Sequence, residues 1–398
     1  MALMLLTARW CKRRGLPPPQ AFTVDHGLRK DSDREAQKVS HWAHIRGVPH
    51  QALVWIGHKP AENIQARARE ARYRLLGERM QALGLKTLLT GHTRDDQAET
   101  FLLRLARGSG LDGLSGMAPV APFPLAGFAE LHIARPLLAF SHKQLMGTLT
   151  QLDQPWIDDP SNADDRFARV QIRNAMTALE NAGLTGERIA GATTHLRRAR
   201  EAIEASVAQL IAAAVELSPW GYALVAADTF AAAPREVSLR ALAKLIEVVG
   251  GGEYPPRFEQ TEAALEWLTA HTGPKGRTLG GCRLARREQR TILIAREEAA
   301  LAKEDPIEQL EPGTRRIWDR RFEIALSQKA KAPLEVRRLG PSGLKSAGKL
   351  AALPPIEPRR IAAALPAVWR EGALIATPLL AVDHAKAQVS ARFLGLAR

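Results

Sequence analysis

Short apolar runs alternate with longer amphipathic stretches through the first 110 residues of the chain. Three apolar runs have the length of strands, and they cover residues 21–24, 51–55 and 87–90. Between the second and third runs, apolar residues recur at helical spacing, at Ile64, Ala68, Ala71 and Leu75. Alternating strands and helices are typical of an α/β fold with parallel strands. We therefore predict a doubly wound parallel sheet in this part of the chain.

Two further helices are predicted in the same region. After the third run, Ala98, Phe101 and Leu105 fall on one helical face, which we expect to be buried, and Gly108 is placed to end the helix. The segment from Ala2 to Trp10 also has a helical pattern, although no strand precedes it. A doubly wound domain normally begins with a strand, so the first helix departs from the expected order.

The composition changes further along the chain. Residues 111–160 are rich in Gly and Pro, residues 161–215 are helical and rich in Arg, and Pro306 and Pro312 mark a later boundary. A chain of 398 residues exceeds what one hydrophobic core usually organises. We predict three domains: an α/β domain over 1–185, a mainly helical domain over 186–305, and a small α+β domain over 306–398.

Charge and cysteine content narrow the class of protein. Lys and Arg outnumber Asp and Glu by 56 to 42, giving a net charge of +14, so a polyanionic partner such as nucleic acid is plausible, with solvated surface charge as the alternative. No apolar run reaches membrane-spanning length, and we expect no membrane partner. Cys11 and Cys282 form neither a disulfide framework nor a metal motif. We predict a cytoplasmic protein.

The segment from Thr90 to Thr100 carries the clearest chemical signal, because it leads from a strand into a helix. Ligands of open α/β folds bind at this edge of the sheet. Asp95, Asp96 and Glu99 lie within one helical turn and can together hold Mg²⁺ with ATP, or a substrate ammonium group. The alternative is that acidic residues in a first turn only complement the helix dipole, worth roughly 0.3–1 kcal/mol each. Three acids beside a Gly-His turn favour a functional role.

Other polar residues follow the strand ends or lie on nearby helices. Asp25 and His26 end the first strand, where they can contact a nucleotide, although a simple turn explains them nearly as well. Arg72 on the helix near the same edge can clamp a phosphate. Arg169 and Arg173 are four residues apart, share a helical face, and can contact phosphates of ATP or RNA. Solvated helix faces are the alternative for these arginines.

Five motifs together resemble the tRNA(Ile)-lysidine synthetases in order and in spacing. They are VDHGLR at 24–29, REARYRLL at 69–76, TGHTRDDQAETFLLRLARGSGLDGLSGM at 90–117, RPLL at 135–138 and DDPSN at 158–162. The resemblance covers residues 1 to about 175, and only a loose similarity extends to GRTLGG at 276–281 and the C-terminal part. It implies an N-type ATP pyrophosphatase, or PP-loop, fold.

The resemblance also implies a reaction and a set of site residues. ATP would adenylate C2 of the wobble cytidine in the CAU anticodon of tRNA(Ile), and the ε-amine of L-lysine would then displace AMP to form lysidine. The implied catalytic residues are Asp95, Asp96, Glu99 and Arg72. The implied ATP-binding residues are Asp25, His26, Arg29, Gly91, His92, Arg169 and Arg173. Mg²⁺ would be bound at Asp96.

The resemblance has one gap at the start of the chain. Families of this kind begin with a strand and an SGGxDS loop that grips the ATP phosphates, whereas Met1–Leu6 resembles the helix after that loop. We therefore expect the chain as written to lack a central strand and to bind ATP poorly, either because an internal Met was taken as the start or because the protein is a truncated relic. The alternative functions are an inactive tRNA-binding protein and another PP-loop tRNA modifier such as a 2-thiolase.

Overall fold

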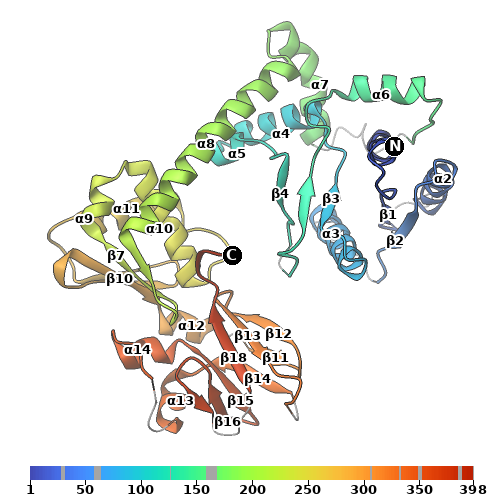
Figure 1. The fold of residues 1–398 in the computed structure, drawn as a ribbon. Coiled ribbons are helices and arrows are strands. Elements are labelled where there is room, and N and C mark those ends of the chain that lie inside the picture. The colour runs from blue at the N-terminus through green and yellow to red at the C-terminus, as the bar shows by residue number, and fades with distance from the viewer. Residues whose placement is uncertain are drawn as a thin grey trace. The chain divides into compact units, whose positions relative to one another are not determined.

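A computed structural model of the chain describes most of its residues. They are residues 1–27, 32–57, 64–125, 127–157, 168–304, 307–330, 333–347, 352–383 and 388–397. Contacts divide the chain into two compact units, Met1–Glu201 and Ala202–Arg398 (Figure 1). Arg29 and the predicted DDPSN motif lie outside the described residues. The predicted division into three domains stays a prediction.

The first unit is a mixture of helices and short strands. Its helices are α1 (Ala2–Arg13), α2 (Ser32–Ile45), α3 (Ile64–Ala82), α4 (Arg94–Ala106), α5 (Leu111–Leu114), α6 (His142–Gln151), α7 (Ala168–Asn181) and the start of α8 (Gly186–Ala214). Its strands are β1 (Ala21–Asp25), β2 (His50–Val54), β3 (Thr87–Leu89), β4 (Val120–Pro122) and β5 (His132–Ala134). The three predicted strands and the predicted helices at the N-terminus and between the strands are confirmed.

The strands of this unit form two sheets instead of one. β1 pairs with β2 in parallel, from Ala21 opposite His50 to Asp25 opposite Val54. β3 pairs with β5 in parallel, and β4 joins the other side of β5 in antiparallel orientation. The predicted α/β class is therefore confirmed, whereas the described strands lie in two short sheets and not in one doubly wound parallel sheet. The physical reason is that β1 and β3 each hydrogen-bond to one strand only within this part of the chain.

Helix α3 packs against strands of both sheets. One apolar cluster joins its buried face to β1, β2 and β3, and it contains Tyr73, Leu76, Met80, Phe22, Val24, Leu53 and Leu88. The predicted stripe of α3 is only partly confirmed, since Ala68 is buried but Ile64 is 43% exposed. The large residues later in the helix, which pack on the strands, form the core instead.

Helix α4 differs more from its predicted pattern. Leu105 is 51% exposed, so the predicted apolar face is wrong at that position, whereas the polar residues Gln97, Glu99 and Thr100 are buried. Gln97 explains part of this, because its amide donates to Met117 O (2.9 Å) and accepts from Met117 N (2.7 Å). The first turns of α4 are buried by polar contacts as well as by apolar packing.

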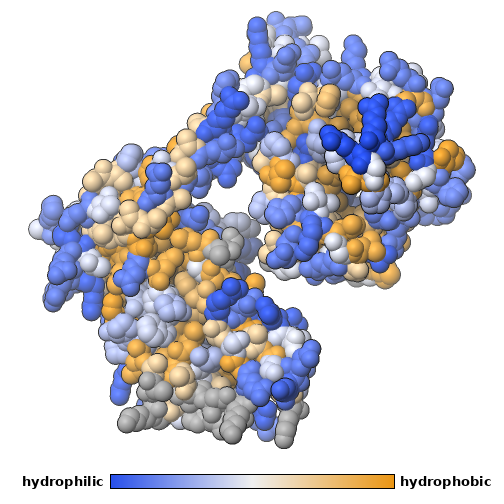
Figure 2. Space-filling model, in the orientation of Figure 1, coloured by the Kyte–Doolittle hydropathy of each residue, from blue (hydrophilic) through white to orange (hydrophobic). Residues whose placement is uncertain are grey.

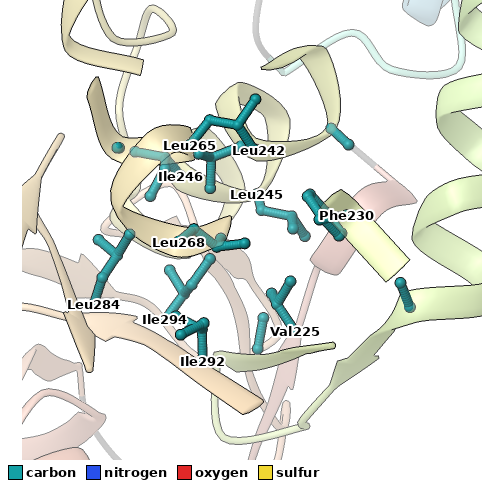
Figure 3. Close-up of a cluster of buried hydrophobic side chains, with 14 of the residues drawn as sticks. Val225, Phe230, Leu242, Leu245, Ile246, Leu265, Leu268, Leu284, Ile292 and Ile294 are labelled. Atoms are coloured by element: carbon teal, nitrogen blue, oxygen red, sulfur yellow. The ribbon is translucent and has the colours of Figure 1, made fainter. Parts of the chain in front are cut away.

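The second unit begins with a sheet and the helices that cover it. The strands are β6 (Val215–Leu217), β7 (Tyr222–Ala226), β8 (Gly276–Leu279), β9 (Cys282–Arg286) and β10 (Thr291–Arg296), in the order β6-β7-β10-β9-β8 and all antiparallel. The helices are α9 (Ala227–Ala232), α10 (Arg235–Gly250) and α11 (Phe258–Thr269). Their core includes Leu242, Leu245 and Leu268 facing Ile292 and Ile294 (Figure 3). The sequence predicts mainly helices in this region and does not predict this sheet.

The remainder of the second unit contains two antiparallel sheets. The helices are α12 (Glu298–Glu304), α13 (Gly340–Ser346) and α14 (Pro358–Ala363). One sheet has the order β11 (Glu308–Leu310), β14 (Leu334–Arg338), β15 (Pro366–Arg370), β16 (Ala373–Thr377), β17 (Val382–Asp383). The other consists of β12 (Arg315–Trp318), β13 (Phe322–Leu326) and β18 (Val389–Phe393). Short strands and turns in this part were predicted.

A buried ion network links the two parts of the second unit. Asp319, in the turn between β12 and β13, accepts from Arg321 Nε (2.6 Å) and from Arg296 Nη2 (3.0 Å), the latter at the end of β10. The side chains of all three residues are at most 3% exposed. Two guanidinium groups thus share one carboxylate away from water.

Part of the positive charge is used inside the fold. Arg286 and Arg290 both donate to Ala270 O, at 2.7 and 2.8 Å, just after the C-terminal end of α11. Arg286 also stacks on Trp267, with 4.7 Å between its Cζ atom and the ring centre. Cations at a helix C-terminus are favourable because they complement the helix dipole. Some of the basic residues, such as Arg286 and Arg290, therefore stabilise the fold and are not free to bind a polyanion.

Figure 2 shows apolar patches among the hydrophilic side chains on the visible face of both units. Exposed apolar side chains include Ile56 (87%) in the first unit and Tyr254 (76%) in the second. Single exposed apolar residues are usual on folded proteins, so they identify no binding surface by themselves. Among the described residues, no helix combines the length and the apolar character needed to cross a bilayer.

Candidate active site at the carboxyl ends of β3 and β5

The paired strands β3 and β5 bring two chain segments together at one edge. Leu89 lies opposite Ala134, and Thr90 N donates to Ala134 O (2.9 Å) just past the end of β3. The turn with Gly91 and His92 therefore lies beside the residue after β5, which is Arg135. Carboxyl ends of parallel strands are where ligands bind in open α/β folds.

Helix α4 begins next to this edge with a capping box. Asp96 N donates to Thr93 Oγ1 (3.3 Å), and Asp96 Oδ2 accepts from Thr93 N (2.8 Å) and Thr93 Oγ1 (2.7 Å). This reciprocal arrangement satisfies backbone donors that the helix itself leaves unpaired. Asp96, the predicted metal ligand, thus stabilises the first turn of α4.

Replacing Thr93 by Ala is expected to loosen the start of α4. Loss of a side-chain cap costs about 1 kcal/mol, so backbone amides near Asp96 and Gln97 should exchange with deuterium about fivefold faster. Hydrogen exchange read by mass spectrometry on the peptide that contains the first turns measures this. Thr148→Ala is the matched control, because its hydroxyl donates only to Gln144 O within α6. Equal exchange in the two variants would contradict the role given to the cap.

Asp95 contacts a different helix. Its Oδ2 atom accepts from His142 N (2.6 Å), the first residue of α6. Its Oδ1 atom lies 3.8 Å from the position that a Cβ atom on Gly186, the first residue of α8, would take. A carboxylate near helix N-termini is stabilised by their partial positive charge. Asp95 therefore caps the N-terminus of α6, whereas Asp96 binds Thr93 and Glu99 binds Arg173.

Glu99 is the buried carboxylate of the cluster. Its side chain is 5% exposed, and its Oε1 atom accepts from Arg173 Nη2 (2.7 Å) and Arg173 Nε (2.8 Å) of α7. Its Oε2 atom is buried and has no hydrogen-bond partner within the described residues. Burial raises the pKa of Glu99, while the ion pair with Arg173 opposes that shift. The structure therefore joins two predicted site residues that are far apart in sequence.

His92 lies in the turn beside these groups. Thr90 Oγ1 and His92 Nδ1 form a hydrogen bond of 2.9 Å. Burial lowers the pKa of His92, and although Asp96 raises it, three nearby cations lower it further, namely Arg135, Arg169 and Arg69. A histidine with a lowered pKa is neutral near pH 7, where it can accept a proton.

Two arginines of this site were not among the predicted site residues. Arg135 belongs to the RPLL motif and follows a strand of only three residues, which sequence patterns rarely identify. Arg69 lies one helical turn before Tyr73, and its guanidinium stacks on that ring with 4.9 Å to the ring centre. One sequence signal could have identified them, because Arg69 begins the REARYRLL motif and Arg135 begins the RPLL motif.

A second group of predicted residues lies at the end of β1. Asp25 Oδ1 accepts from Gly27 N (2.8 Å), which forms a turn, and His26 packs edge-on against Trp55 with 6.0 Å between ring centres. His26 Nε2 lies 3.1 Å from Arg72 Nη2 and 3.2 Å from Arg72 Nε. His26 and Arg72 are therefore brought together, whereas Arg29 lies outside the described residues.

The described residues include no group of three or more His, Cys, Asp or Glu side chains placed to hold a metal ion. A magnesium ion that arrives with a nucleotide needs fewer protein ligands, because one or two carboxylates and the phosphates suffice. Asp96, whose Oδ2 atom is used in the capping box, can offer Oδ1 to such an ion. The described site therefore fits a Mg²⁺ ion that arrives with a nucleotide.

Comparison with known proteins gives a consistent answer. A family described as a PP-loop domain matches residues 1–180. The tRNA(Ile)-lysidine synthase of Bradyrhizobium sp. (strain BTAi1) is 42% identical over 301 residues, covering 71% of this chain and 82% of that protein. That of Ruegeria pomeroyi is 35% identical over 389 residues, covering 95% and 85%. That of Anaplasma marginale is 32% identical over 326 residues, covering 82% and 68%. The similarity thus extends well beyond the PP-loop domain.

Proposed function

This chain belongs to the tRNA(Ile)-lysidine synthases, and from that premise we propose how its residues divide the chemistry. The enzyme is an ATP-dependent ligase with a PP-loop domain that synthesises lysidine in tRNA(Ile). In the proposed reaction, the C2 oxygen of the wobble cytidine in the CAU anticodon attacks the α-phosphate of ATP and releases pyrophosphate. The ε-amine of L-lysine then attacks C2, AMP leaves, and the amine loses a proton.

Glu99 carries this proposal, because a buried carboxylate with one unpartnered oxygen calls for a ligand that donates hydrogen bonds. The ε-ammonium group of lysine is such a donor. We assign Glu99 Oε2 to the substrate amine and Oε1 to Arg173. Arg173 then orients the carboxylate, and we assign it to a place near the single phosphate of the adenylate.

His92 is the residue best suited to take the proton from the attacking amine. Attack on C2 requires the neutral amine, so the ammonium group must first lose a proton to a nearby base. The lowered pKa of His92 keeps its imidazole neutral near pH 7, and the hydrogen bond with Thr90 fixes the ring. Asp96 lies close enough to favour the imidazolium ion that results.

The nucleotide is assigned to the end of β1 and to the turn after β3. Asp25, His26 and Arg72 form one side, and the backbone at Gly91 forms the other. Mg²⁺ bound to the ATP phosphates would use Asp96 as its protein ligand and would neutralise charge on the leaving pyrophosphate. Asp95 is assigned to α6, where it positions the start of that helix. Arg169 remains assigned to phosphate.

The 2-thiolase alternative receives no support from a specific observation. A 2-thiolase that uses cysteine chemistry needs clustered cysteines, whereas Cys11 and Cys282 are both free and buried and belong to different units. A protein that only binds tRNA remains distinguishable by experiment. We place the reaction in the cytoplasm, where tRNA modification and ATP meet.

The test uses the purified protein with ATP, Mg²⁺, isotopically labelled L-lysine and a tRNA(Ile) transcript with a CAU anticodon. We expect label to enter the tRNA only at high ATP concentration, because the sequence lacks the SGGxDS loop, with AMP and pyrophosphate released only when tRNA is present. The control is the same transcript with a GAU anticodon, which lacks the wobble cytidine and should stay unlabelled. Binding of tRNA without label or pyrophosphate would instead indicate a protein that only binds tRNA.

A further inference from the structure

Arg135 has an unused donor next to the amine pocket. Its Nη1 atom donates to Ala118 O (2.8 Å), which holds the side chain in place, while its Nε atom is buried and lacks a hydrogen-bond partner in the described part of the chain. The strand register puts Arg135 beside the turn of His92. Buried donors in native proteins are nearly always satisfied, so a ligand is expected at this one.

Arg69 on α3 is also without an acidic partner, unlike its neighbours. Arg67 and Arg74 pair with Glu70 on the same helix, at 3.3 and 2.7 Å. Arg69 is exposed and stacks on Tyr73, and no carboxylate within the described residues pairs with it. Stacking on an aromatic ring fixes the direction of a guanidinium group without using its hydrogen-bond donors.

Arg69 stacks on Tyr73, and Tyr73 shares one apolar cluster with Ile133, two residues before Arg135, so the two cations are neighbours. Burial lowers the pKa of Arg135 most, and Arg69 lowers it further, so the two guanidinium groups repel each other. Both also lower the pKa of His92, as does Arg169. Like charges held together without a counterion are unfavourable, and an anion that binds between them relieves the repulsion.

We propose that Arg69 and Arg135 bind a backbone phosphate of the tRNA, on the nucleotide whose base enters the pocket of Glu99 and His92. The inference rests on the proposed function, because that function brings an RNA base to this pocket. In RNA, the ribose joins each base to a backbone phosphate a short distance away. A pocket that binds one base of an RNA chain therefore needs a site for that phosphate beside it. Arg69, which is exposed, lies where an incoming strand can reach it.

The phosphates of ATP are the competing anion, and two observations favour the RNA backbone. The residues assigned to ATP, such as His26 and Arg72, contact each other at the end of β1, in the other sheet. Arg69 and Arg135 instead lie near His92, which the proposed function assigns to the lysine amine, although the backbone of Gly91 in the same turn is assigned to ATP. The planar guanidinium fork suits the two free oxygens of a phosphodiester group.

The test compares Arg69→Gln with Arg67→Gln, which removes the same charge two residues away on an exposed part of the same helix. Binding of fluorescent tRNA(Ile) is measured by anisotropy over a salt series, without ATP or lysine. We expect Arg69→Gln to weaken binding roughly tenfold at low salt and to reduce the slope of log K against log salt by about one. The control should keep the slope of the original protein.

A second variant guards against an effect on folding. Arg135→Lys keeps the charge but loses the fork, and it should weaken tRNA binding while circular dichroism stays unchanged. An unchanged salt slope in Arg69→Gln overturns the proposal. Weakened binding of radiolabelled ATP with intact tRNA binding also overturns it, because the anion would then be the nucleotide polyphosphate. Since these measurements need no turnover, a protein that binds tRNA but forms no lysidine contradicts only the proposed function.

Discussion

Replacing Glu99 by Gln is expected to slow lysidine formation about 100- to 1000-fold. The amide keeps the size of the side chain but removes the buried charge that we assign to the lysine amine, and it leaves Arg173 without its carboxylate. Losing one partner of a buried charge-assisted contact typically costs roughly 2–5 kcal/mol. Initial rates with lysine varied at saturating tRNA and ATP measure the effect, which should include a higher KM for lysine.

The matched control for that experiment is Glu130→Gln. Glu130 belongs to the same unit and is 82% exposed, with only a long contact of 3.5 Å to Lys86. Its replacement should leave the rate unchanged, because exposed ion pairs contribute little. A Glu99→Gln enzyme with kcat/KM for lysine within twofold of the original would remove the basis of the proposed amine pocket. Circular dichroism on both variants excludes gross unfolding.

Replacing Asp319 by Ala is expected to destabilise the second unit by about 3–5 kcal/mol, the usual cost of removing one partner from a buried ion network. Arg296 and Arg321 would be left as buried cations without their shared carboxylate. The adjacent Trp318 is fully buried, and its exposure on unfolding contributes to the tryptophan fluorescence of the chain, which has eight tryptophans. Urea-induced unfolding followed at that emission should show a clearly lower midpoint.

Asp228→Ala is the control for Asp319. Asp228 pairs with Arg290 at 2.8 Å but is 66% exposed, so its loss should have a small effect. A third variant, Asp319→Asn, keeps the size of the side chain and one acceptor oxygen but removes the charge, and it should lie between the other two. If Asp319→Ala unfolded at the same urea concentration as Asp228→Ala, the network would not stabilise the unit.

Local patterns predicted the elements around the site well. The strands before Asp25 and before Gly91, and the helices that carry Arg72 and Glu99, were expected from periodicity of a few residues, and all are present. Such elements depend on neighbouring residues, which the sequence displays directly. Glu99 and Arg173 were both predicted as site residues, but their contact was not, because 74 positions separate them in the chain.

The parts that escaped prediction depend on distant partners. Strands β7 and β10 pair through residues that are far apart in the sequence, such as Tyr222 and Ala295. No short sequence pattern predicts such pairs. Burial of Gln97 in α4 likewise follows from its two bonds to the backbone of Met117. Apolar periodicity cannot identify a polar side chain that is buried because a loop needs its hydrogen bonds.

The capping box of α4 complicates any genetic survey of this enzyme. A screen scored by turnover would label Asp96 indispensable even if it never touched magnesium, since its loss also frays the turn that holds Glu99. Thr93→Ala removes the same capping box and leaves the side chains of Asp96 and Glu99 unchanged. The ratio of lysidine-forming rates between the Asp96→Ala and Thr93→Ala enzymes therefore distinguishes a direct role of Asp96 in the reaction from its role in capping α4. Neither variant alone makes that distinction.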